Sequence, residues 1–516
     1  EVTEPTEKTE NEIHIYKASE LKWLADQVNN EVNLFEGYTI YLENNIDLGA
    51  REENGNWETE KNEALKWTAI GKEIEKTLKA EIDGKNHIIK GVYVNDVTNF
   101  NGIFGRTNAI SNLIVKNSYI KGAKYTAGIV GELASGTINN CHNVNTTVIG
   151  NAEYSFGGIV AKANGSISNC SNTGKIIGGK NEKETSQTGG IVGYTSNDVT
   201  NCFNTGIITG EGVFVGGVVG ALVSSSQTIL DCYNIGTVTG DASVGGIVGI
   251  TYSNVSNCYN TGKIIGRDTR GYSETGGIVG SAYNNVMDCY NAGSVSGGEG
   301  YHVGGIVGFL TENMIISNCY NIGNITSQGK QTGGISGTAG PSSQITNCYN
   351  TVAVTGSDKV GGIAGVAFES SQITDCYNEG VITGNEDVAG IVGVAANIVT
   401  KCYNTGTITG NANVGGIVGD CFAGIPQNIS LCYNTGTVKG GKEVGGISGY
   451  LGAQGYAGTE TKCYNKGKII YTGTEENYGE IIGNMGNDAT VTKSYYLAND
   501  ENNYGVGTIN AGGNIE

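Results

Sequence analysis

A short line of sequence recurs through most of this chain and constrains its fold more than any other feature. From Cys402 the line reads CYNTGTITG, NANVG and GIVG, and close copies begin at Cys258, Cys376 and Cys432. Equivalent positions return about every 29 residues over residues 101–483. Such self-similarity at a fixed period is typical of stacked repeats, in which each unit packs on its neighbours.

The composition of the repeat indicates short strands joined by tight turns. The chain has 84 glycines and 3 prolines among 516 residues, and the glycines separate Ile, Val and Tyr without the period of collagen. Three short strands and three turns fit into about 29 residues, which makes one coil of a solenoid. We therefore predict an all-β fold, a parallel β-helix (β-solenoid) of about 14 coils, with a right-handed path.

The ends of the chain depart from the repeat. We predict a disordered leader at residues 1–11, a capping helix with irregular first coils at 12–100, the β-helix repeats at 101–483, and a terminal partial coil at 484–516.

The helix is expected at Ser19–Asn29, with Ser19 as its N-cap. Its apolar positions fall on one face, which would cover the open end of the first coil. These positions are Leu21, Leu24, Ala25 and Val28.

Twelve of the 13 cysteines occupy the same place in successive repeats. Side chains that leave parallel, in-register strands point the same way, which suits disulfide geometry poorly. We predict a column of buried, reduced thiols, with the following aromatic residue pointing outward. Cys421 lies out of register in an insertion and is expected to react first. The asparagine two positions after each repeat cysteine is predicted to turn a corner in the left-handed conformation and to hydrogen-bond from coil to coil.

One aromatic position recurs directly after the repeat cysteine. Rings that point outward would form a ladder able to stack on sugar rings or apolar peptide, whereas the same stack could serve only to stabilise neighbouring coils. Both interpretations stay open on the sequence. The loops Gly179–Thr188 and Arg267–Thr275 are longer than their counterparts and are further candidates for ligand contact. The candidate ligand-binding residues are Tyr259, Tyr290, Tyr320, Tyr349, Tyr377, Tyr403 and Tyr433.

Charge and motif content argue against several functions. The formal net charge of −19 disfavours nucleic acid as a partner, and no apolar run is long enough to span a membrane. The four histidines stand singly, and neither HExxH nor GxSxG occurs. We therefore predict no catalytic residue, no metal and no cofactor.

An enzyme that processes polysaccharides remains an alternative, because some parallel β-helices do so. Such a site needs clustered carboxylates. Here Asp231, Asp288 and Asp375 share one position in the repeat but are separated by repeats with asparagine. The chain is therefore expected not to be an enzyme.

Several motifs together resemble the GLUG-motif proteins, a family of bacterial surface and secreted repeat proteins. They are the entry segment IYKASELKWLADQVN at 15–29, WTAIG at 67–71, IDGKNHIIKG at 82–91, NGIFG at 101–105, and the later GGIVG and NCYNTGxIxG repeats. The resemblance implies an extracellular, cell-wall-associated stalk or adhesin that could contact a host glycan or glycoprotein, and we expect a monomer. Similar repeats accompany IgA-specific zinc metallopeptidases as a non-catalytic region, which is the second alternative.

Overall fold

The protein is an all-β parallel solenoid of about 16 turns, spaced by about 29 residues, with very few helices. The predicted fold class is confirmed, with slightly more turns than expected. The computed structural model describes residues 2–97, 99–151, 154–179, 186–267, 273–300, 302–395, 398–421, 427–452, 458–474, 478–497, 505–509 and 514–515.

The chain divides into two compact units, which we describe one at a time. Unit 1 comprises Glu1–Asp241 and Gly246–Ser253, and unit 2 comprises Ala242–Gly245 and Asn254–Glu516. Neither helix of the described chain has the length and apolar character needed to cross a membrane.

One turn of unit 2 contains five short strands. Two of them meet at the glycine pair, two flank the repeat cysteine, and the last completes the turn. They are β58 (Ala412–Gly415), β59 (Val418–Cys421), β60 (Gln427–Ser430), β61 (Tyr433–Asn434) and β62 (Val438–Gly440).

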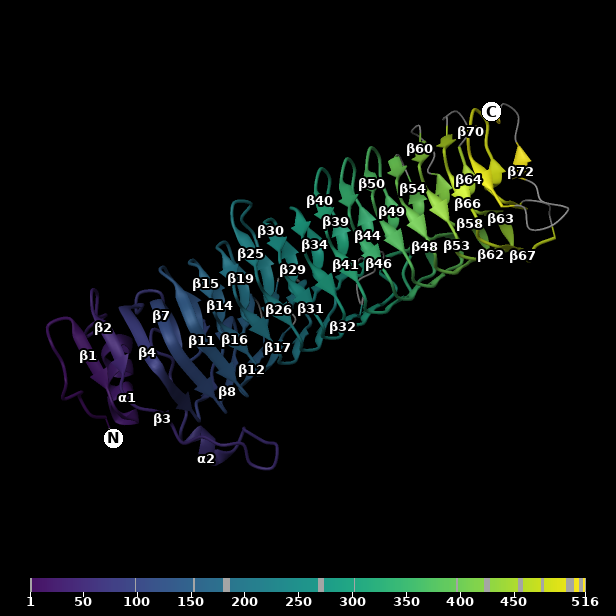
Figure 1. The fold of residues 1–516 in the computed structure, drawn as a ribbon. Coiled ribbons are helices and arrows are strands. Elements are labelled where there is room, and N and C mark those ends of the chain that lie inside the picture. Colours follow the sequence, from purple (N-terminus) through teal and green to yellow (C-terminus); the bar gives the residue numbers. More distant parts are fainter. Residues whose placement is uncertain are drawn as a thin grey trace. The chain divides into compact units, whose positions relative to one another are not determined.

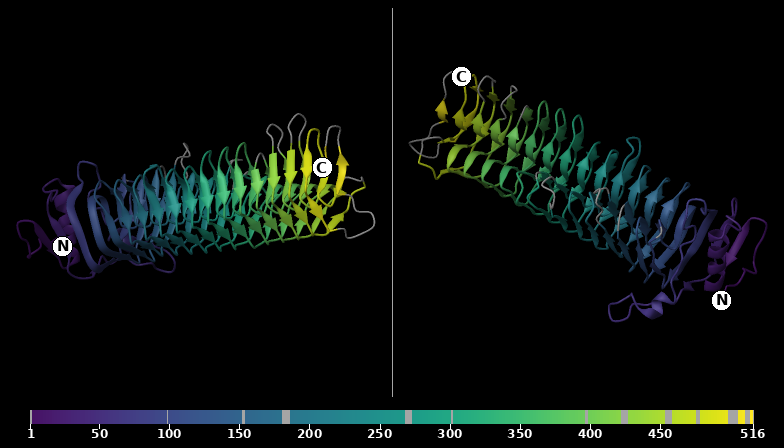
Figure 2. Two further views of the ribbon diagram at one scale, coloured as in Figure 1. Left: turned by 45° about the horizontal axis from the view of Figure 1, so that its top comes forward. Right: turned by 180° about the vertical axis from the view of Figure 1, so that it is seen from behind.

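Successive turns pair in parallel and in register, so equivalent residues form columns. Tyr403 is level with Tyr433, and Asn404 is level with Asn434. Figure 2 shows the strands of unit 2 aligned from turn to turn. Because side chains alternate along a strand, one of these columns points outward and the other inward.

The interior is filled by aliphatic and cysteine side chains. All 13 cysteines are buried and free, as predicted for the twelve in the repeats. In the GGIVG strand both middle positions are fully buried, as Ile363 and Ala364 show. A serine is accepted at the second position because a backbone acceptor is near: the Ser336 hydroxyl donates to the Thr338 carbonyl at 2.8 Å.

Two local predictions about the repeat were wrong. Cys421 is not in a loop but ends β59, where it is 1% exposed and level with Ala395 of the preceding turn. The left-handed conformation belongs to the residue before the repeat cysteine, not to the asparagine after it. Asn347 and Asp375 both have φ of 53° there. Their short polar side chains tolerate this region, although Lys401 adopts it as well (φ 52°).

An amphipathic helix lies near the start of unit 1, directly after the first strand. It runs over α1 (Ala18–Asn29), so Ser19 lies inside the first turn, and the N-cap is Lys17 without a side-chain cap. The predicted capping role of Ser19 was therefore wrong. Glu20 accepts a 2.7 Å hydrogen bond from the backbone N–H of Tyr16 instead, which places a carboxylate at the positive end of the helix dipole. The buried residues are Glu20, Leu21, Leu24, Ala25 and Val28.

The first strands of unit 1 already coil before the repeats begin. In Figure 1 they follow one another beside the helix, and each pairs in parallel with the next. A short helix, α2 (Glu60–Glu63), lies between them in the chain. These additional turns raise the count above the predicted 14. The strands are β1 (Glu12–Ile15), β2 (Thr39–Leu42), β4 (Leu78–Lys90) and β7 (Phe104–Lys116).

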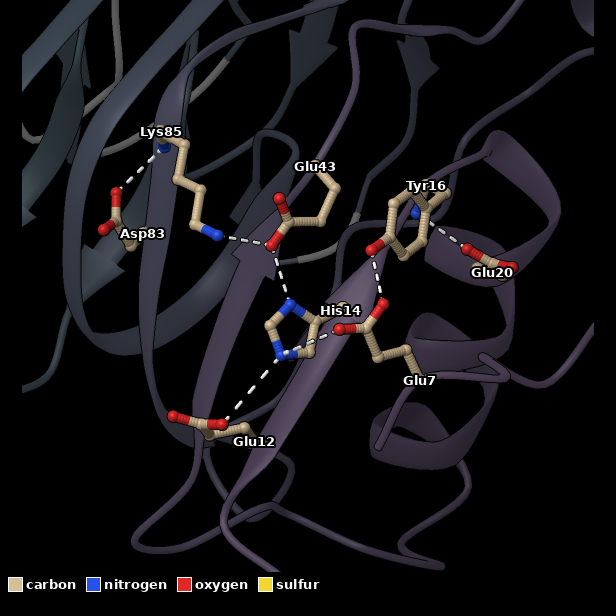
Figure 3. A network of polar contacts seen from close by, with 8 residues as sticks. All are labelled: Glu7, Glu12, His14, Tyr16, Glu20, Glu43, Asp83 and Lys85. Carbon is tan, nitrogen blue, oxygen red and sulfur yellow. Dashed lines mark hydrogen bonds and ion pairs between the residues drawn. The ribbon is translucent and has the colours of Figure 1, made fainter. Parts of the chain in front are cut away.

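A polar network joins the first three of these strands (Figure 3). His14 Nδ1 lies 2.7 Å from Glu43 Oε1, and Lys85 donates to the same carboxylate. These contacts hold the pKa of Glu43 below its ordinary value, the Lys85 hydrogen bond contributing most. Tyr16 donates to Glu7, and this hydrogen bond helps raise the pKa of Tyr16 to about 12. Glu7 belongs to segment 1–11, whose disorder stays a prediction.

Candidate ligand-binding face

The tyrosine stripe, defined as the seven residues Tyr259, Tyr290, Tyr320, Tyr349, Tyr377, Tyr403 and Tyr433, lies on the outside of unit 2. Each tyrosine begins a two-residue strand whose second residue is the inward asparagine, as in β61. Consecutive ring centroids are 4.8–5.0 Å apart, and the ring planes deviate by 2–6°. In-register pairing therefore imposes a face-to-face stack.

The stripe is half-buried along its length and more open at one end. Tyr433 is 40% exposed, whereas the other six rings have intermediate exposure. Burial, followed by the neighbouring tyrosines, raises the pKa of Tyr290 and Tyr377. The phenols of Tyr290 and Tyr377 are therefore neutral at physiological pH. Of the two uses left open by the sequence, stacking between turns occupies the ring faces, so along the stripe a ligand can reach only the outward ring edges and hydroxyls.

Behind the stripe runs a ladder of buried asparagines. Asn404 donates to Asn434 Oδ1 at 2.8 Å and to the Gly406 carbonyl at 2.9 Å. It accepts from Asn378 at 2.8 Å and from the Gly406 N–H at 3.2 Å. The coil-to-coil amide bonding that we predicted is confirmed. Both polar atoms of the Asn404 side chain are thus hydrogen-bonded. The ladder therefore fixes the backbone on which the neighbouring tyrosine stands.

A second surface lies at the glycine pairs, and sequence reasoning missed it. A Cβ added to Gly416 would lie 2.1 Å from the Gly446 carbonyl oxygen of the next turn, so no side chain can stand at this corner. The outward side chains of the strands before and after the pair therefore approach one another. The signal in the sequence is the position after GIVG, which varies between repeats, as in Ser281, Phe309 and Asp420.

In unit 2 this corner brings two carboxylates together. Asp387, in β53 (Glu386–Ala389), accepts a 2.8 Å hydrogen bond from Asn413 in β58. Asp420 in β59 is affected by the same group: burial, then the charge of Asp387, raises the pKa of Asp420 to about 7. The sequence analysis considered Asp231, Asp288 and Asp375 and missed this pair.

Other chemistry finds less support in the part of the chain that is described. No three His, Cys, Asp or Glu side chains there are placed to hold a metal ion. Of the two long loops, residues 180–185 and 268–272 lie outside the described residues.

Comparisons with known proteins agree with the repeat. The GLUG motif matches residues 152–177 and 240–265, which confirms the resemblance at these two repeats. None of the curated proteins matches the chain. A crystal structure of an immunoglobulin A1 protease candidate from Bacteroides ovatus is similar, with a TM-score of 0.37 and 17% sequence identity over 64% of this chain and 80% of that one.

Proposed function

We propose that this chain is a non-catalytic repeat region of an extracellular bacterial protein, on the cell surface or secreted, that presents or binds ligand. The observation that carries the proposal is the tyrosine stripe, in which seven outward rings lie nearly parallel to one another beside a buried ladder of asparagine amides. Because neighbouring rings cover one another's faces, the exposed row consists of ring edges and phenol hydroxyls, which can donate hydrogen bonds to, and accept them from, the hydroxyls of a host glycan or glycoprotein.

A glycan and mucin binding screen tests this proposal. The triple variant Tyr290→Ala, Tyr320→Ala, Tyr349→Ala removes three consecutive rings from the middle of the stripe and should lower binding at least about tenfold, since each lost hydrogen bond costs about 0.5–1.5 kcal/mol. The matched control is Ser296→Ala, Thr326→Ala, Thr355→Ala, which alters the outward positions of the last strand in the same three turns.

Selective binding that the tyrosine variant loses and the control variant keeps supports adhesion through the stripe. Because each removed ring is expected to cost about 1 kcal/mol of stability, circular dichroism should first show that both variants are folded under the binding conditions. If no host ligand binds the native chain, the repeats act as a spacer and the proposal is wrong.

The Asp387–Asp420 pair favours a second candidate, a polysaccharide-processing enzyme. A carboxylic acid with a pKa near 7 can act as the general acid in glycoside cleavage, and such a site uses a second carboxyl group close by. Release of oligosaccharides from a polysaccharide panel, abolished by Asp420→Asn, would support the enzyme. Absence of products from every polysaccharide would support the non-catalytic proposal.

A further inference from the structure

A pocket opens at the glycine-pair corner of unit 1. It has a volume of about 330 Å³ and is lined by residues that do not recur in the repeats, which places it at the small end of the usual range for ligand sites, roughly 300–1,000 Å³. The lining residues are Tyr125, Tyr154, Ser155, Lys162, Gln187 and Tyr194.

The lining comes from two columns that face each other across the corner. Before the glycine pairs, β9 (Tyr125–Ala127), β13 (Ser155–Gly157) and β18 (Gln187–Gly189) place their first residues outward. Ser155 donates to Gln187 at 2.8 Å. After the pairs, Lys162 in β14 (Val160–Ala163) is level with Tyr194 in β19 (Val192–Thr195).

Aromatic faces make up much of the pocket wall. The Tyr125 and Tyr154 rings lie 5.2 Å apart at 38°, and Tyr125 is backed by Phe100, 5.4 Å away and nearly parallel. Tyr154 has φ of 89° and a 38% exposed side chain. A tyrosine in this region is strained by about 1–3 kcal/mol, and such strain is concentrated at functional sites.

Positive charge surrounds these rings although the chain as a whole is acidic. Lys162 and Arg106 share Glu132, at 2.9 Å and 3.0 Å. Burial alone would raise the pKa of Glu132, but these two hydrogen-bonded cations hold it below its ordinary value. Lys124 lies 5.4 Å from the Tyr154 ring centre. Among the described residues that these contacts join, three cations thus accompany one carboxylate, and Lys162 has further protons to donate.

We infer that this pocket binds an acidic sugar residue, a hexuronate or a sialic acid, with its ring against the tyrosines and its carboxylate toward Lys162 and Lys124. A cage of tyrosines could also take an ammonium group. Here two lysines already lie over the rings, 5.4 Å and 5.7 Å from the ring centres of Tyr154 and Tyr125, and they repel a second cation. This site is separate from the tyrosine stripe, so it goes beyond the proposed function.

Titration of the native chain with sialyllactose and with a galacturonate oligomer tests the inference. We expect saturable binding with Kd on the order of 0.1–1 mM, which is typical for a few contacts, and at least about tenfold weaker binding of lactose and a neutral galactose oligomer. Raising the salt from 0.05 M to 0.5 M should weaken binding of the acidic probes, because exposed charges are screened.

The key variant is Tyr154→Asn. Asparagine tolerates the left-handed region, so the fold should keep its stability while binding falls at least about tenfold. Tyr194→Ala, on another strand, should act similarly, and Lys124→Gln should weaken only the acidic probes. The stripe variant Tyr290→Ala, Tyr320→Ala, Tyr349→Ala should bind these probes normally, which keeps this test independent of the proposed function.

Three results would overturn the inference. The first is absence of saturable binding of either acidic probe to the native chain. The second is equal affinity for acidic and neutral sugars. The third is full affinity in both Tyr154→Asn and Tyr194→Ala.

Discussion

The asparagine ladder and the tyrosine stripe of unit 2 leave the same two-residue strands in opposite directions. Both repeat a single residue at the spacing of the turns, yet their surroundings differ. Asn404 is fully buried with four hydrogen bonds, whereas Tyr403 is half-buried and contacts its neighbours through ring faces. The repeated asparagine inside the coil therefore stabilises the fold. The repeated tyrosine outside forms a long surface on which every position is equivalent.

Unit 1 shows the complementary case. Its pocket is assembled from Tyr125, Lys162, Gln187 and Tyr194, which occupy equivalent corners but differ in kind. A localised site needs such differences, because identical residues on every turn would bind a ligand equally well at any of them.

The largest expected effect tests the inner column. Asn404→Ala removes a side-chain amide that donates two hydrogen bonds and accepts two. It leaves the Gly406 N–H and carbonyl buried without these partners. We expect a loss of roughly 3–5 kcal/mol in the free energy of unfolding of unit 2, measured by chemical denaturation followed by circular dichroism. Thr405→Ala, an exposed neighbour, should change it by less than about 0.5 kcal/mol. Equal midpoints for the two variants would contradict the assigned role of the ladder.

An effect of intermediate size is expected at the glycine-pair corner of unit 2, where the outward residue Asp420 lowers the free energy of unfolding when it ionises. Asp420 has a pKa of about 7 in the folded chain, above its ordinary 3.8. Between these values the folded state binds more protons than the unfolded state, so stability falls as pH rises from 4 to 7 and is level above. From pH 5 to pH 8 we expect a loss on the order of 1–2 kcal/mol, less than the full shift implies because the side chain is partly exposed.

Asp420→Asn should reduce this pH dependence in thermal unfolding and should stabilise the protein at pH 8; a part of the slope should remain, because burial also raises the pKa of Asp387. The exposed Glu386→Gln is the control and should leave the slope as it is in the native chain. A native chain whose stability does not fall between pH 5 and pH 7 would show that Asp420 ionises normally.

The smallest effect is expected at the stripe. Tyr377→Ala removes one ring between two stacked neighbours, and we expect a loss of about 1 kcal/mol, the usual size of an aromatic pair contribution. Tyr377→Phe should be nearly neutral. A loss of 3 kcal/mol or more on denaturation would mean that the stripe mainly holds the turns together, which would weaken the case for a binding surface.

The sequence by itself determined the period, the parallel stacking and the sides on which the repeated residues lie. Identical residues at equal spacing can only meet one another, so the buried cysteines, the amide ladder and the outward tyrosines followed from the repeat. It also identified the apolar face of α1, since helical periodicity is a local property.

Only the tertiary structure decided which residues meet where the repeat varies. Asp387 approaches Asp420, and Tyr125 and Tyr194 line one pocket, because the glycine pair brings strands of different turns to one corner. Cys421 is buried because its neighbours extend a strand over the preceding turn. Such contacts depend on the backbone path between turns, and a position that carries a different residue in each repeat holds no information about its partner across the corner.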